Sequence, residues 1–265
     1  MKKRVMCVFG TRPEAVKLAP VVHALRQSKS LEPVVAITAQ HREMLDQMMR
    51  WFDVKADYDL DLMKHGQTLA ELTGRVLNGI DQLLSKDKPD LLLVQGDTTT
   101  VMSAALAAFY QKVPVGHVEA GLRTNDRYNP FPEEMARRQT GRLATLHFAP
   151  TALAVENLKK EGIVDNVFMT GNTVIDALLD TAGRLQADQI DHAVFGAFQF
   201  RAQKLGAEIP RNLHHALGCL LAHGVELLRC QQAVLYAIGQ RFFKERPSVK
   251  QGYRLHGFQM ADSSS

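Results

Sequence analysis

The sequence of 265 residues contains only three cysteines, Cys7, Cys219 and Cys230, and no CxxC pair. Three cysteines cannot build a disulfide framework, which excludes the small disulfide-rich secreted folds and favours a reducing compartment. No uninterrupted apolar run approaches the roughly 20 residues of a membrane-spanning helix. Because the run Val5–Phe9 is also too short for the core of a signal peptide, we predict a cytoplasmic protein without a membrane partner.

Glycine (18) and proline (10) are near background usage, which excludes collagen-like and low-complexity chains. The excess of positive over negative charge is also small. The net charge of +4 divides into a surplus of one before Asp180 and a surplus of three from there on, with no dense block of Lys and Arg. Only 7% of residues are aromatic, and they form no stacking pattern, so we predict no nucleic-acid partner.

Short apolar runs alternate with longer segments of helical period through the first 179 residues. This alternation indicates a parallel sheet with helices on both faces. The run Leu91–Val94 is apolar throughout, which is typical of a central strand buried on both sides. The predicted strands are Arg4–Phe9, Pro33–Thr38, Asp90–Val94, Val113–Val118, Leu146–Ala149 and Val167–Met169. The predicted helices are Pro13–Arg26, Thr68–Leu84, Thr98–Tyr110, Pro132–Leu143 and Ala152–Lys160.

The remainder of the chain has a different character, because no strand pattern recurs and Ala, Leu and Gln become frequent. We therefore predict a Rossmann-like α/β domain in residues 1–179 and a divergent, mainly helical or partly disordered tail in residues 180–265. The tail segments with helical period are Gly183–Gly196, Ala202–Ala207 and Asn212–Tyr236.

The first candidate site lies where the strand ending at Phe9 meets the next helix, because ligands of doubly wound sheets bind outside the carboxyl ends of the strands. Gly10 permits a tight exit, and Thr11 can cap the helix. The free backbone N–H groups of that helix, with Arg12 and Lys17, could face an anion. Neither GxxxxGK[ST] nor GxGxxG is present, so solvated basic residues on a helix surface are the alternative.

The next two strand ends supply carboxylates. Asp97 follows the buried strand and is either the N-cap of the next helix or a carboxylate at the rim of the sheet. A capping carboxylate has a lowered pKa and makes a poor base, so the two roles are only partly compatible. Glu119 follows the strand ending at Val118 and is flanked by small residues, so a ligand could approach it. His117 lies on the same side of that strand, either as a buried structural histidine or as a catalytic one.

A fourth candidate is the loop and helix start around two prolines, where Glu133 and Glu134 stand in the first turn. Glutamates at a helix start are favoured by the helix dipole alone. Adjacent helical positions diverge by about 100°, so we expect at most one of the two to face a cleft.

Five strings stand in order along the first two thirds of the chain. They are FGTRPEAVKLAP (Phe9–Pro20), TAQHREMLDQM (Thr38–Met48), QGDTTTVMSAALAAFYQKVPVGHVEAGLRT (Gln95–Thr124), FPEEMARR (Phe131–Arg138) and GNTVIDALL (Gly171–Leu179). Together they resemble the non-hydrolysing UDP-N-acetylglucosamine 2-epimerases of bacteria, over residues 3–179. Ala136 is a small departure, since the family usually carries Asn there.

The resemblance implies the N-terminal half of a glycosyltransferase-B type fold, whose active site lies between two Rossmann-like halves. It implies interconversion of UDP-N-acetylglucosamine and UDP-N-acetylmannosamine by inversion at C2, through elimination and re-addition of UDP. It implies no cofactor, no metal and a homodimer. By the same resemblance Asp97, Glu119 and Glu133 match the family's catalytic acids, and Arg12 and Lys17 match its substrate-binding basic residues. It does not decide which carboxylate is the base.

The resemblance ends at Leu179, and the GHRRE-like and SDSGG-like motifs of the family's second domain do not occur in the tail. We therefore expect that domain to be missing from this sequence. One hypothesis, which we favour, is a gene altered after the first domain by frameshift or rearrangement. The other is a genuine variant whose tail packs onto the first domain. The functional alternative is a catalytically inactive half that binds sugar nucleotide weakly or pairs with an intact homologue.

Overall fold

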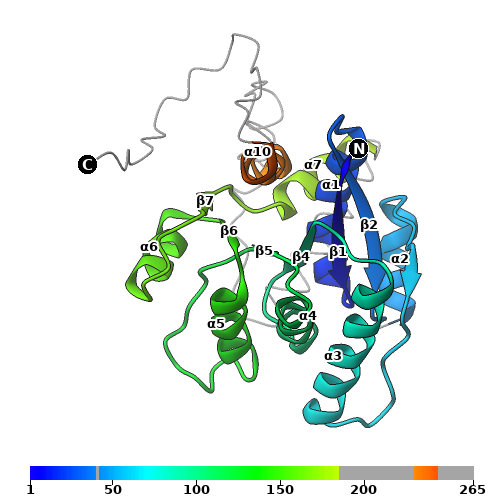
Figure 1. The fold of residues 1–265 in the computed structure, drawn as a ribbon, viewed down its shortest axis with the longest axis vertical. Helices are drawn as coiled ribbons and strands as arrows, with labels where there is room; N and C mark the ends of the chain where they lie inside the picture. The colour runs from blue at the N-terminus through cyan, green and yellow to red at the C-terminus, as the bar shows by residue number, and fades with distance from the viewer. Residues whose placement is uncertain (40–41, 185–229, 244–265) are drawn as a thin grey trace, which may run out of the picture.

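A computed structural model describes residues 1–39, 42–184 and 230–243 of the chain. In these residues seven parallel strands form one sheet in the order β3-β2-β1-β4-β5-β6-β7, with helices on both faces (Figure 1). The strand order reverses between β1 and β4, which defines a doubly wound fold and confirms the predicted class. The strands are β1 Lys3–Phe9, β2 Leu31–Ile37, β3 Tyr58–Asp59, β4 Leu91–Gln95, β5 Val115–Val118, β6 Leu146–Ala149 and β7 Val167–Met169. The helices are α1 Arg12–Gln27, α2 Arg42–Trp51, α3 Leu69–Lys86, α4 Thr99–Tyr110, α5 Glu133–Leu143, α6 Ala152–Lys160, α7 Val174–Arg184 and α10 Cys230–Phe243.

Alternate residues of the central strands enter two separate hydrophobic cores. In β1, Met6 and Val8 pack in the core that α3 and α4 cover, whereas Cys7 and Phe9 pack in the core that α1 and α2 cover. The same alternation holds in β4, and all of Leu91–Val94 is inaccessible to solvent. This result confirms the prediction of a central strand buried on both sides, because side chains of a strand alternate between its two faces.

Three elements were not predicted, the helices α2 and α7 and the strand β3. Helix α2 buries Leu45 and Met49 and packs Met48 against the same core, so its apolar residues have helical spacing and the signal for this helix was present in the sequence. Strand β3 has two residues and pairs with the end of β2 at the sheet edge, which is too short for a periodic signal.

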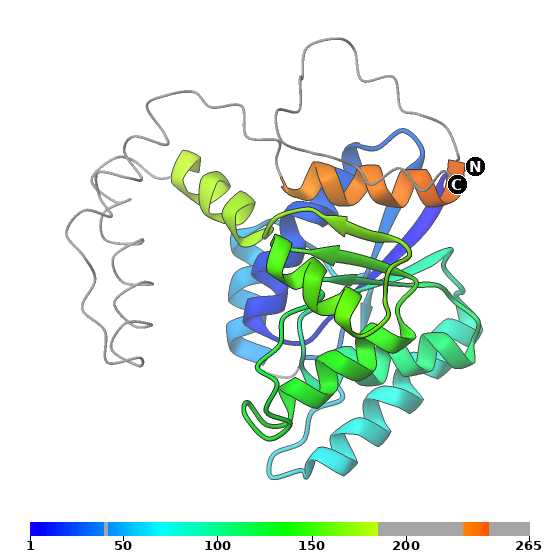
Figure 2. The same cartoon turned by 90° about the vertical axis from the view of Figure 1, so that its left-hand side faces the viewer.

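The described part of the tail belongs to two helices. Helix α7 continues through Asp180 as far as Arg184, so it crosses the predicted domain boundary. Of the predicted tail helices, only the end of Asn212–Tyr236 and the first residues of Gly183–Gly196 are described, in α10 and α7; the others lie outside the described residues. Helix α10 packs against α1 and α7 (Figure 2). In the described ranges no helix is both long and apolar enough to cross a membrane.

Candidate functional site

The predicted site residues lie at the carboxyl edge of the sheet, around the reversal of strand order between β1 and β4. Strands β1, β4 and β5 are neighbours and parallel, so the residues that follow them meet at one edge. Lys17 contacts Glu119 across this edge, and the charges of Lys17, Glu119 and Glu133 all act on Asp97. Arg12 stands at the start of α1 with an exposed side chain that has no partner in the described part of the chain. The structure therefore brings four of the five predicted residues together and places Arg12 at the helix start above them.

Three donors from three elements hold the Glu119 carboxylate. Lys17 Nζ and Gln95 Nε2 each lie 2.5 Å from Oε2, and Asn172 Nδ2 donates to Oε1 at 2.9 Å. The backbone of Glu119 has φ +66°, in the left-handed region that side chains other than glycine rarely adopt. A position that is strained and also triply bonded is over-determined by its surroundings, a pattern found at functional sites. Sequence reasoning missed Gln95 and Asn172, although both lie in the motif strings, Gln95 as the last residue of β4 and Asn172 just beyond the end of β7.

Asp97 is not the N-cap of α4, so that interpretation was wrong. Thr98 is the N-cap, and its hydroxyl accepts a hydrogen bond from the backbone N–H of Val101. The Asp97 carboxylate lies instead 2.5 Å from Arg137 Nη2. Burial raises the pKa of Asp97, Arg137 opposes the rise, and the nearby charges of Glu119 and Glu133 add to it. A raised pKa brings a carboxyl group closer to the range in which it can exchange protons at neutral pH.

Glu133 and Glu134 are divided by the turn of α5, as the sequence leads us to expect. Glu134 is completely buried and accepts hydrogen bonds from the backbone N–H of Thr124 at 3.1 Å and from Arg138 Nε at 2.9 Å. Burial alone would raise the pKa of Glu134, but these donors outweigh it and hold the pKa below its usual value. Glu133 is half-buried, and its carboxylate has no hydrogen bond or ion pair within the described ranges. Glu133 lies close enough to Asp97 for its charge to act there, while Glu134 secures the start of the helix.

A carboxylate of α1 binds the N–H groups of the two residues that lead into this helix. Glu14 is buried, and its Oε2 accepts from the N–H groups of Gly10 at 2.7 Å and Thr11 at 2.9 Å. Its Oε1 accepts from the Thr98 hydroxyl at 2.7 Å, so Glu14 joins the β1–α1 junction to the start of α4. Burial raises the pKa of Glu14, against the effect of these donors. The signal for this role was available, since Glu three residues after a Thr cap forms a capping box.

His117 has the buried structural role that the sequence favoured. Its Nε2 donates to the carbonyl oxygen of Gly96 at 2.7 Å, so the ring supports the turn that precedes Asp97. Burial lowers the pKa of His117 to about 3, with the neighbouring His147 adding to the effect. The ring is therefore neutral at physiological pH and is not a proton carrier there.

Gly121, two residues after Glu119, has φ +90°, and a Cβ there would lie 2.2 Å from the carbonyl oxygen of Ala154. We expect Gly121→Ala to lower the free energy of unfolding by about 2–4 kcal/mol, through left-handed strain and steric overlap together. Gly162→Ala is the matched control, because Gly162 has φ +75° but open space around it, and it should cost only about 1–2 kcal/mol. Urea unfolding measures the stability of both variants. Equal losses of unfolding free energy would show that the close approach of Gly121 to α6 does not add to the cost.

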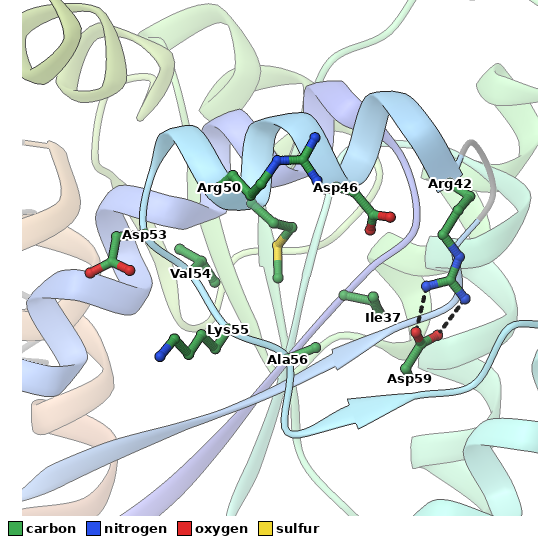
Figure 3. Close-up of a pocket in the computed structure, with 10 residues that line it drawn as sticks. Ile37, Arg42, Asp46, Arg50, Asp53, Val54, Lys55, Ala56 and Asp59 are labelled. Atoms are coloured by element: carbon green, nitrogen blue, oxygen red, sulfur yellow. Dashed lines mark hydrogen bonds and ion pairs between the residues drawn. The ribbon is translucent and has the colours of Figure 1, made fainter.

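A hollow of about 460 Å³ lies apart from these residues, between α2 and the strands β2 and β3 (Figure 3). Among the charged residues that line it, Arg42 forms an ion pair with Asp59 at 2.5 Å, and Arg42 also binds Asp61. None of the predicted site residues lines it, so we assign it no part in the chemistry. Among the described residues no cluster of His, Cys, Asp and Glu could hold a metal ion.

The sequence is similar to those of known epimerases. The sequence profile of the UDP-N-acetylglucosamine 2-epimerase family matches residues 23–213, more than half of the chain. The chain belongs to this family. The 2-epimerase of Yersinia pestis is 58% identical over 176 residues, which are 66% of this chain and 47% of that protein. The 2-epimerase of Escherichia coli K12 is 56% identical over 177 residues, 66% of this chain and 47% of that protein.

Solved structures extend the family relationship to the fold. The crystal structure of UDP-GlcNAc 2-epimerase from Neisseria meningitidis bound to UDP-GlcNAc superposes with a TM-score of 0.67 at 52% identity, and the match covers 74% of this chain and 54% of that one. Another crystal structure of a UDP-N-acetylglucosamine 2-epimerase gives a TM-score of 0.66 at 55% identity, covering 67% of this chain and 50% of that one. The chain of this epimerase-family member thus spans about half the length of the relatives it matches.

Proposed function

We propose that this chain acts on UDP-N-acetylglucosamine as a 2-epimerase, interconverting it with UDP-N-acetylmannosamine. The observation that carries the proposal is the group of Asp97, Glu119 and Glu133 with Lys17 at one edge of the sheet, in a member of the epimerase family. The Neisseria meningitidis relative, which aligns with this chain, was solved with UDP-GlcNAc bound. That relative supports the substrate class.

The reaction needs proton transfer on two faces of the sugar. In the elimination step a base removes the C2 proton, the electrons of the C2–H bond form the C1–C2 double bond, and the C1–O bond breaks with its electrons leaving on UDP. In the re-addition step a UDP phosphate oxygen attacks C1, and an acid returns a proton to C2 on the opposite face. Because the C2 proton is weakly acidic, its removal must be coupled to departure of UDP. Positioned acids and bases give each proton transfer about 10²–10⁴-fold.

The carboxylates have distinct surroundings that suit such a division of work. Asp97 has a raised pKa and a guanidinium partner, and Glu133 is half-buried without a hydrogen-bond partner in the described ranges. We assign proton transfer at C2 to these two residues. We assign Glu119, with its three donors, to the same substrate site. Arg12 and Lys17 supply positive charge for the diphosphate, which gains negative charge as UDP departs.

The test is a coupled assay for UDP-N-acetylmannosamine, run in D₂O, together with calorimetric titration of UDP. We expect the product to carry deuterium at C2 and expect UDP to bind. Lys17→Met should weaken UDP binding by about tenfold or more, because it removes one of the two cations that we assign to the diphosphate. Lys160→Met is the matched control, since Lys160 is an exposed lysine of α6 paired only with Glu156, and it should leave both measurements unchanged.

The alternative function is a half that binds sugar nucleotide without turning it over or pairs with an intact homologue, and the observation in its favour is the length that the chain shares with its relatives. UDP binding that depends on Lys17 without product formation would support it. Absence of both turnover and UDP binding would show that the epimerase proposal is wrong for this chain.

A further inference from the structure

Helix α10 is fixed to the domain at its N-terminus by a carboxylate of another helix. Asp176 of α7 is buried, and its two oxygens accept from the backbone N–H groups of Cys230 at 3.1 Å and Gln231 at 3.0 Å. The first N–H groups of a helix have no partner within it and carry partial positive charge. Asp176 therefore caps α10 from outside, across 54 residues of sequence.

The inner face of α10 completes a core of the sheet domain. Val234, Ala237 and Ile238 are fully buried in the same cluster as residues of β1 and α1, and α10 lies across α1 and α7 (Figure 2). Near the other end of the helix, Lys3 Nζ stands 5.8 Å from the centre of the Phe242 ring. The helix is thus packed along its length against the domain that contains the candidate site.

The start of α10 also touches the loop that supports Glu119. Gly171 has φ +76°, and a Cβ on it would lie 2.6 Å from Cys230 Sγ, so the helix approaches the loop backbone closely. The next residue, Asn172, donates to Glu119 Oε1 at 2.9 Å. A second donor to Glu119, Lys17, comes from α1, on which α10 also packs. Two of the three groups that hold Glu119 therefore rest on elements that α10 contacts.

We propose that α10 is a positioning element of the site, which holds the Gly171–Asn172 loop and α1 so that Asn172 and Lys17 keep Glu119 in its left-handed conformation. Asp176 and Val234 are then positioning residues for Glu119. The effect on turnover rests on the proposed function, whereas the effect on the loop does not. The tail lacks the family's second-domain motifs, but through α10 it thereby becomes part of the candidate site of the first domain.

The test uses two variants of the full chain. Val234→Asp places a charge in the buried face of α10. Tyr236→Asp, the control, places the same charge at a residue of the same helix that is 43% exposed. In Val234→Asp we expect alkylation of Cys230 to become at least tenfold faster and hydrogen exchange to rise in residues 170–176. Tyr236→Asp should behave like the parent. Peptide mass spectrometry assigns both signals. If α10 is released and exchange at 170–173 stays at the parent level, the proposal is overturned.

Turnover gives the second readout. Val234→Asp and Asn172→Ala should each lower kcat at least tenfold with little change in KM, and the double variant should be no slower than the slower single variant, because both act through the same contact with Glu119. If the losses of kcat in the two single variants multiply in the double variant, the proposal is overturned. If the parent itself does not turn over, the proposed function fails and the exchange measurement alone decides the inference.

A variant that unfolds the whole domain would show exchange rising everywhere. In that case Asp176→Asn, which keeps the shape and removes the capping charge, replaces Val234→Asp. It should raise exchange at Cys230, Gln231 and residues 170–173 while the central strands β1 and β4 stay protected. Unchanged exchange in the loop with a loosened α10 overturns the proposal here as well.

Discussion

Replacing Asp97 by Asn is expected to lower kcat by about 10²–10⁴-fold, because an amide cannot exchange the proton that the C2 inversion requires. The substitution keeps the size of the side chain and leaves a carbonyl oxygen for Arg137. The KM for UDP-N-acetylglucosamine should change less than kcat. The measurement is steady-state formation of UDP-N-acetylmannosamine by the parent and the variant.

The pH profile gives a sharper reading of the same substitution. Because burial raises the pKa of Asp97, the limb of kcat/KM that Asp97 controls should lie at higher pH than an ordinary aspartate would give, and the Asn variant should lack it. Asp165→Asn is the matched control, since Asp165 is exposed and distant from the site in the described structure, and it should keep both rate and profile. A rate within twofold of the parent in Asp97→Asn would remove Asp97 from the chemistry.

The largest effect on stability is expected from Glu134→Ala, which should lower the free energy of unfolding by about 3–5 kcal/mol. The substitution leaves the N–H groups of Thr124 and Asn125 without their acceptor and removes the buried carboxylate partner of Arg138, which keeps Asn125 Oδ1 and Glu161. Domains of ordinary stability have only about 5–15 kcal/mol in total, so the variant should unfold at much lower urea concentration. Urea unfolding followed by circular dichroism measures the loss.

Glu156→Ala is the control for that loss, because Glu156 forms an exposed pair with Lys160 on α6. Such surface pairs contribute about 0–1 kcal/mol.

Acid adds a second test of the contribution of Glu134 to stability. The pKa of Glu134 is lowered in the fold, so its contribution is complete above its unfolded pKa and is lost as pH falls through the lower folded value. Equal stability losses in the two variants would mean that the buried network does not support α5.

The sheet and most of its helices could be predicted because their residues carry a periodic signal. Leu91–Val94 is apolar at every position, and Thr11 and Thr98 stand at helix starts where hydroxyl groups are favoured. Helix α2 could have been predicted, since Leu45, Met48 and Met49 have helical spacing. Strand β3 could not, because a two-residue edge strand owes its conformation to tertiary contacts. The spacing of apolar residues in a sequence indicates only which face of a segment is buried.

The sequence directed attention to Asp97 and Glu119 but not to the residues that contact them. Strand ends drew attention to Asp97 and Glu119, because parallel strands bring their carboxyl ends to one edge. The partners came from elsewhere: Arg137 lies on α5 and Asn172 follows β7, and no spacing in the sequence relates either residue to the carboxylate it holds. The cap of α4 was misassigned by one residue, since Asp and Thr are both good caps and only the backbone conformation decides between them.

The carboxylate of Glu14 has a consequence for the way this edge would recognise a charged molecule. In many nucleotide sites the amide groups of a helix start bind the phosphates directly. Here Glu14 accepts from the N–H groups of Gly10 and Thr11, which lead into α1, so these two amides are not free to bind a phosphate in this arrangement. Of the two nearby cations, Lys17 is paired with Glu119 and Arg12 is exposed. An exposed cation is screened over about 8 Å at physiological ionic strength, so the attraction of Arg12 for an anion at this edge should weaken as the salt concentration rises.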